Sequence, residues 1–238
     1  MTTRLSQSLV ALTLLALLVG CRGDSSWLPT QPDSRSSNAG VWLQARGYPN
    51  SWEAMGVVGT TLSDHTLSVF AHDGKSPVSG VQIVWAVTGS GGWVSSTHDT
   101  TRDGVSAPPL TLGPGEGRYT VTATAPTLPR APQITFKATA VTVMVRVRGP
   151  VDGGFLPASV TVPRGRSVGW RYDDGGEGDV HNVTFEDGAA SSGDLWNLWA
   201  GRLYHSKLFE GPPRAVRYRC TYHSTSFTEG EVGTVTVE

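Results

Sequence analysis

The stretch Ala215-Val-Arg-Tyr-Arg-Cys220-Thr-Tyr-His223 indicates β-structure in the C-terminal half, because its apolar and polar side chains alternate up to a cysteine. Such alternation is typical of a β-strand with one buried face. Another strand is predicted over Gly233-Thr-Val-Thr-Val-Glu238, at the end of the sequence. Cys220 and His223 are therefore expected on the loop that joins the last two strands.

More strands are predicted upstream, separated by turns rich in glycine, proline and aspartate. The turns are Pro163-Arg-Gly165 and Asp173-Asp-Gly-Gly176. The strands are Ala158–Val162, Ser167–Arg171 and His181–Phe185. We expect residues 143–238 to form one β-sandwich.

A separate β-domain is predicted over residues 38–142. Its clearest strand, Val81-Gln-Ile-Val-Trp-Ala-Val87, places Trp85 on an apolar face, as expected of the core tryptophan of a sandwich. Further strands are expected at Leu67–Ala71, Gly117–Thr124 and Ile134–Ala140. Because no stretch has sustained helical periodicity, the sequence predicts an all-β chain with two sandwiches in tandem.

Charge and motif content argue against several functions. The formal net charge is −1 and the basic residues are scattered, so nucleic-acid binding is not expected. The sequence has no Gly-x-Ser-x-Gly elbow, no His-Glu-x-x-His zinc motif and no His-x-His pair. The chain is therefore not expected to be an enzyme.

The N-terminus predicts export. The apolar run Leu9–Val19 is too short to span a bilayer and has the length of a signal-peptide core. It ends in Leu18-Val19-Gly20-Cys21, which resembles a bacterial lipobox and implies a signal peptide over residues 1–20 and acylation of Cys21. An ordinary secretory signal is the alternative.

The lipobox resemblance also implies where the protein acts. Residues 21–37, which include the lipidated cysteine, would form a flexible tether from membrane lipid to the first domain. The protein is expected in a bacterial cell envelope, with its folded domains periplasmic or extracellular.

Once Cys21 is acylated, Cys220 has no partner for an intramolecular disulfide. A lone thiol can be a small buried apolar group or a metal ligand. His223, three residues later, and His181, far upstream, favour ligation. One thiolate and two imidazoles are the donors of a mononuclear copper site of the blue type.

The first domain has a characteristic set of turn glycines and core positions: Pro77-Val-Ser-Gly-Val81, Val84-Trp85, Gly91-Gly92, Arg102-Asp-Gly-Val105, Leu112-Gly113 and Tyr119-Thr-Val-Thr-Ala123. With these positions the domain resembles the bacterial Ig-like domains of intimin and invasin. The resemblance implies a spacer or stalk.

The second domain combines the candidate ligands with a series of spaced positions: Phe155-x-Pro157-Ala158, Val162-x-x-Gly165, Val168-x-Trp170, His181-Asn182-Val183-x-Phe185, Tyr218-x-Cys220-x-x-His223 and Gly230-x-x-Gly233. With this ligand order the domain resembles the plastocyanin-like cupredoxins. The resemblance implies that His181, Cys220 and His223 bind one copper ion for one-electron transfer with a redox protein partner. It also implies that Asn182 ties the two ligand loops together and directs its backbone N–H towards the Cys220 sulfur.

The sequence departs from that family at the axial position. Cupredoxins usually have a methionine where this chain has Glu231, in Gly230-Glu231-Val232-Gly233. Glu231 can bind the metal, point outward, or mark a site that no longer transfers electrons. The alternative function is a surface scaffold or binding lipoprotein whose cupredoxin domain stores copper without redox traffic or is degenerate.

Overall fold

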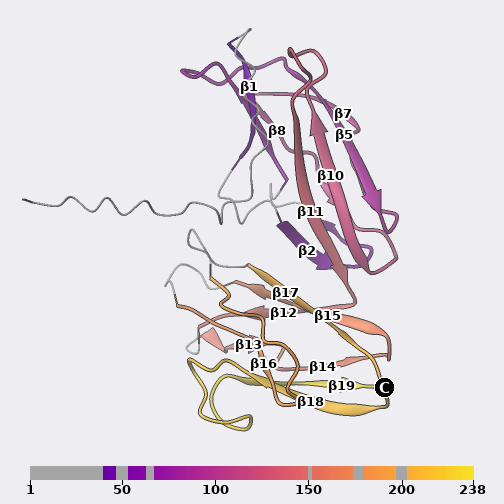
Figure 1. Ribbon diagram of the computed structural model, residues 1–238, viewed down its shortest axis with the longest axis vertical. Helices are drawn as coiled ribbons and strands as arrows, with labels where there is room; N and C mark the ends of the chain where they lie inside the picture. Colours follow the sequence, from indigo (N-terminus) through magenta and orange to yellow (C-terminus); the bar gives the residue numbers. More distant parts are fainter. Residues whose placement is uncertain (1–39, 47–52, 63–66, 150–151, 174–178, 197–202) are drawn as a thin grey trace, which may run out of the picture.

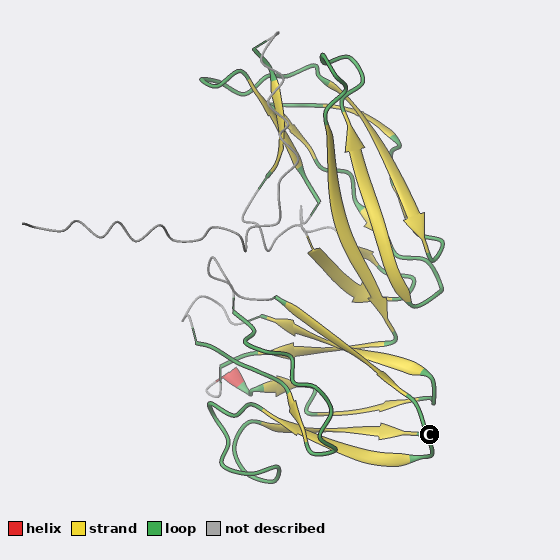
Figure 2. Cartoon of the chain, viewed as in Figure 1, coloured by secondary structure: helices red, strands yellow, loops and turns green. Residues whose placement is uncertain are grey.

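The computed structural model describes residues 40–46, 53–62, 67–149, 152–173, 179–196 and 203–238. These residues form β-strands and no α-helix, with a 3₁₀ turn at Asp152 (Figure 2). Within the same ranges there is no helix long and apolar enough to cross a membrane. The prediction of an all-β chain is confirmed. The proposed signal peptide and Cys21 lie outside the described residues.

The N-terminal domain packs one large sheet against two small ones. Figure 1 shows the large sheet beside the small sheet that contains β1 and β8. The large sheet has the order β2 (Glu53–Val57), β11 (Gln133–Val141), β10 (Gly117–Thr124), β5 (Gln82–Gly89) and β7 (His98–Thr100). One small sheet has the order β1 (Trp42–Ala45), β4 (Val69–His72) and β8 (Val105–Ser106). The other has the order β3 (Thr61–Leu62), β9 (Leu110–Thr111) and β6 (Trp93–Val94).

Trp85 lies at the centre of this domain, as its position in the alternating strand predicts. Its indole is 1% exposed and stacks on Phe136, with the ring centroids 5.9 Å apart. The indole N–H donates to the Ser106 hydroxyl at 2.9 Å, so its polar atom is satisfied inside the core.

The C-terminal domain is a sandwich of two four-stranded sheets (Figure 1). The first has the order β13 (Phe155–Leu156), β12 (Val143–Val147), β15 (Arg166–Tyr172) and β17 (Tyr204–Phe209). The second has the order β14 (Ser159–Val162), β19 (Val232–Val237), β18 (Arg214–Arg219) and β16 (Thr184–Phe185). Trp170 is fully buried between the two sheets and packs edge-to-face on Tyr218, with the ring centroids 5.2 Å apart.

Two details of the second domain differ from expectation. The predicted strand His181–Phe185 is wrong in its first half, because only β16 forms a ladder and His181 makes an isolated bridge with Leu195. His205 follows Leu203-Tyr204 and belongs to no ligand motif of the sequence, so it is expected to be exposed. The structure places it partly buried instead. Its ring lies 5.7 Å from that of Trp170, since β17 turns this residue towards the aromatic core.

The two domains are joined without a spacer, because Thr142 is the single residue between β11 and β12. The Glu116 carboxylate of the first domain accepts the Thr142 hydroxyl hydrogen and the Ser167 backbone N–H of β15, the latter at 3.0 Å. Beside this brace Gly169 faces the Met55 sulfur so closely that a Cβ at position 169 would lie 2.6 Å from it. The orientation of the domains is thus set by direct contacts.

Replacing Glu116 with alanine is expected to destabilise this junction. The partly buried Ser167 N–H would lose its acceptor, so a loss of about 1 kcal/mol in the free energy of unfolding is expected, at the lower end of the range for buried donors. Thermal unfolding should show the loss, and hydrogen exchange should accelerate at the Ser167 amide. Glu116→Gln keeps one acceptor oxygen, so its stability should lie between that of Glu116→Ala and that of the unaltered chain. Unchanged exchange at Ser167 in Glu116→Ala would contradict the role of the brace.

Candidate metal centre

Three of the candidate ligands come from one hairpin. Cys220 follows β18 and Glu231 precedes β19, and the Cys220 N–H donates to the Glu231 carbonyl at 3.0 Å. The loop between them returns His223 to the same place, because the Glu231 N–H donates to the His223 carbonyl at 3.2 Å. The pairing of β18 with β19 therefore fixes the spacing of all three side chains.

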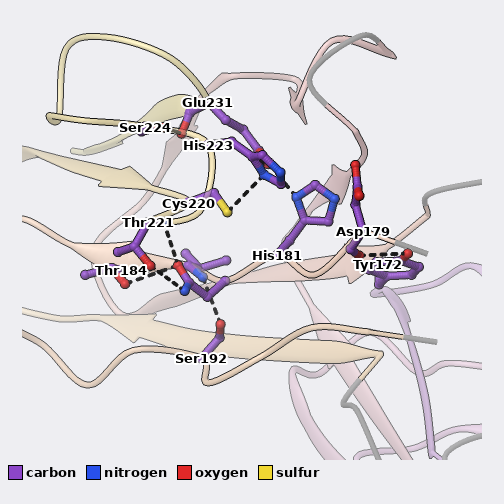
Figure 3. A network of polar contacts seen from close by, with 12 residues as sticks. Tyr172, Asp179, His181, Thr184, Ser192, Cys220, Thr221, His223, Ser224 and Glu231 are labelled. Atoms are coloured by element: carbon purple, nitrogen blue, oxygen red, sulfur yellow. Dashed lines mark hydrogen bonds and ion pairs between the residues drawn. The ribbon is translucent and has the colours of Figure 1, made fainter. Parts of the chain in front are cut away.

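His181 arrives from the other direction, on the connection between β15 and β16. Its backbone N–H and C=O both bond to Leu195, at 3.1 and 2.7 Å. These bonds hold the imidazole against the hairpin, with its ring centroid 4.8 Å from that of His223 (Figure 3).

The structure brings the four side chains into one cluster. One donor atom from each of His181, Cys220, His223 and Glu231 lies within 4.8 Å of all the others. The Glu231 Oε2 atom is 3.1 Å from His181 Nδ1 and 3.0 Å from His223 Nδ1. The Cys220 sulfur lies 3.4 Å from His223 Nδ1 (Figure 3).

The cluster is shielded from solvent on most sides. His181, Cys220 and the Glu231 side chain are buried, whereas the His223 side chain is 21% exposed. Burial by itself lowers the pKa of His181, but hydrogen bonds to Cys220 and Glu231 outweigh it and raise the pKa to about 10. The contacts with Cys220 and Glu231 therefore favour the protonated form of His181 in the metal-free protein.

These four residues fit a transition-metal ion. Bonds of about 2.0–2.3 Å to one tetrahedral ion would leave the donors roughly 3.3–3.8 Å apart. The closest donor pairs here are 3.0 to 3.4 Å apart and the whole group lies within 4.8 Å. Among the described residues, the buried Glu231 Oε1 has no hydrogen-bond partner. A thiolate with two imidazoles suits copper or zinc, and the carboxylate adds a hard donor.

Glu231 points into the cluster, so the interpretation that it points outward is wrong. The reason lies on the neighbouring loop at Gly154, where a Cβ would lie 2.8 Å from the Glu231 Cγ. Gly154 also has a φ of +62°, which other residues rarely adopt. The glycine thus leaves the space that the glutamate side chain fills.

Asn182 joins the two ligand-bearing segments through its side chain. The amide oxygen accepts the Thr221 N–H at 2.9 Å, and the amide nitrogen donates to the Thr221 hydroxyl at 2.7 Å. Because Thr221 follows Cys220 and Asn182 follows His181, this pair of bonds fixes the two ligands relative to each other. The predicted approach of the Asn182 N–H to the Cys220 sulfur stays a prediction.

Several supporting residues escaped the sequence analysis. Gly154 and Thr221 carry no motif of their own. The Ser224 hydroxyl donates to the Glu231 carbonyl at 2.6 Å, and the Ser192 hydroxyl accepts the Val183 N–H at 2.8 Å. The pair Gly153-Gly154, just before the matching positions Phe155-x-Pro157-Ala158, was the one available signal for a tight turn.

No protein-family model matches this chain, and no curated protein matches it. Solved structures resemble its parts. A structure described as a novel purple cupredoxin from Nitrosopumilus maritimus has 21% identity over 40% of this chain and 99% of its own, with a TM-score of 0.29. A mutant fern plastocyanin has 23% identity over 40% and 99%, with a TM-score of 0.28. The D0-D1 domain of intimin has 10% identity over 82% and 94%, with a TM-score of 0.30.

At these identities and TM-scores the similarities do not assign a function to this chain. The clustering of four donor side chains is a feature of this structure itself and does not depend on those similarities.

Removing the Asn182 amide is expected to loosen the centre. Asn182→Ala removes both hydrogen bonds to Thr221, which are partly buried, and should lower the free energy of unfolding by about 0.5–1.5 kcal/mol for each bond. Chemical denaturation of the metal-free chain measures this. Asn182→Asp keeps the acceptor oxygen and should lose less stability than Asn182→Ala. Equal stability of Asn182→Ala and the unaltered chain would contradict the bridging role.

Proposed function

We propose that this chain is a copper-binding electron carrier whose C-terminal domain holds one copper ion with His181, Cys220, His223 and Glu231. The observation that carries the proposal is the convergence of one thiol, two imidazoles and one carboxylate within 4.8 Å, from segments far apart in sequence. When bound, copper would supply one-electron chemistry by alternating between Cu(II) and Cu(I).

The protein's own contribution is a rigid donor set. The hydrogen bonds of the β18–β19 hairpin and of Asn182 hold the donors in place before any ion arrives. Little rearrangement would then accompany a change of one electron. His181 is enclosed in the domain while the edge of His223 reaches solvent, so His223 offers the shorter route to a redox protein partner.

The proposal includes a membrane location. Acylation of Cys21 would anchor the chain to a membrane of the bacterial cell envelope, and residues 21–37 would link the lipid to the N-terminal domain. The first domain would then act as the spacer between membrane and copper domain. We do not assign catalysis to this centre, and the proposal rests on donors suited to electron transfer.

A second candidate function is metal storage without redox traffic. The inward carboxylate of Glu231 favours it, because a hard anionic donor stabilises Cu(II), or a bound Zn²⁺, over Cu(I). Retention of zinc in preference to copper, or a copper form that cannot be reduced reversibly, would support this candidate.

Titration of the purified metal-free chain with Cu(II) tests the proposal. One equivalent should produce an intense visible absorption band from the thiolate–copper bond, and ascorbate should bleach it reversibly. Cys220→Ser should lose the band because a hydroxyl replaces the thiolate. A chain that stays colourless and fails to retain copper would overturn the proposal.

Replacing Glu231 with methionine is expected to raise the reduction potential of the copper-loaded chain. A thioether lacks the negative charge that stabilises Cu(II), and a tenfold shift in relative affinity towards Cu(I) corresponds to about 59 mV. Spectroelectrochemistry should show a rise of at least that size. Glu231→Gln, which keeps the shape and removes the charge, should also raise the potential; an unchanged potential in both variants would rule out ligation by Glu231.

A further inference from the structure

A cavity of about 650 Å³ lies at the junction of the two domains. One wall is the outer face of strands β2, β11 and β10 of the first domain, and the opposite wall is strand β17 of the second. Figure 1 shows β2 of the first domain lying directly above β17 of the second, where the domains meet. No residue of the metal cluster lines this space, so it is a separate site.

The strand register shows which side chains face the cavity. Arg118 lies opposite Thr139, and Thr120 lies opposite Lys137, in the pairing of β10 with β11. These four residues alternate with buried neighbours such as Tyr119 and therefore share the outer face. Arg118 and Lys137 stand diagonally across the strand pair, within reach of one common ligand.

The charges on this wall are not balanced. Glu53 of β2 is aligned with Lys137 in the parallel pairing with β11, so it offsets one positive charge. Among the described residues, neither Arg118 nor Lys137 forms an ion pair. Arg118, Lys137 and Glu53 together therefore give the lining of the cavity one net positive charge.

The second domain adds polar groups from β17. Tyr204 and Ser206 line the cavity, and Ser206 is paired with Gly169, the residue that faces Met55 across the junction. His205 alternates with them, and its ring packs on Trp170 and Phe185 in the core. The cavity is thus completed by hydroxyl groups from both domains and is present only in their docked arrangement.

We propose that this interdomain cavity binds a small molecule through an oxyanion, either phosphate or carboxylate. The planar guanidinium of Arg118 matches two oxygens of such a group, and Lys137 adds a second positive charge. Thr120, Thr139 and Ser206 supply hydroxyl groups that can donate to the remaining oxygens. Glu53 disfavours the most highly charged anions by repulsion.

Isothermal titration of inorganic phosphate, and separately of citrate, into the purified full chain tests the proposal. One saturable site is expected for at least one of the two anions. Arg118→Gln should weaken binding about tenfold or more, since it removes charge-assisted hydrogen bonds. Glu53→Gln should strengthen binding, an outcome that a misfolded variant cannot produce.

Matched controls separate this site from surface charge and from the metal centre. Lys137→Gln removes a positive charge from the cavity and should weaken anion binding. Lys75→Gln removes the same charge from an exposed turn of the first domain and should leave anion binding unaltered. Cys220→Ser should also bind the anion normally, because it alters the metal centre alone. No saturable binding of either anion at about 10 mM, or equal binding by Arg118→Gln and the unaltered chain, would overturn the proposal.

Discussion

The buried carboxylate of Glu231 is the constraint on which the metal centre depends. An ionised group in a protein interior is costly unless charges or hydrogen bonds of opposite character surround it. Here two imidazoles approach one oxygen at 3.0 and 3.1 Å, and the hairpin hydrogen bonds hold the carboxylate between them. The raised pKa of His181 reflects the same compensation. A divalent metal ion bound to Glu231 would replace the proton on His181 as the compensating positive charge. Compensation of either kind allows a carboxylate to lie in the interior of the domain.

The sequence predicted the strands well where a single local pattern determined them. Gly117–Thr124 matches β10 at both ends, because its alternation is uninterrupted and both neighbouring strands pair with it. The strand expected at His181–Phe185 was half wrong, because the Asn182 side chain bonds across to Thr221 while the backbone at His181 makes only an isolated bridge. The inward direction of Glu231 was not predictable either, since it depends on the space at Gly154, far away in sequence. Alternation captures burial along one strand, whereas contacts between distant loops need the fold.

The docking of the domains connects the two proposed sites in one architecture. Glu116 reaches from the first domain to the backbone of β15, and β15 pairs with β17, the strand that closes the anion cavity. The same β15 carries Trp170, which packs on Tyr218, two residues before Cys220 of the four-residue cluster. Residues of the first domain thus form one wall of the interdomain cavity.

The single residue between β11 and β12 has a consequence for how this chain can vary. Loops at the outer ends of the sandwiches can gain or lose residues with little effect on the core. At Thr142 an insertion would move the hydroxyl away from Glu116 and shift β12 relative to its partners, and a shift of one residue turns each side chain of a strand to the other face. Length changes among relatives should therefore be rare at this joint, and the two domains should be inherited as one block rather than exchanged separately.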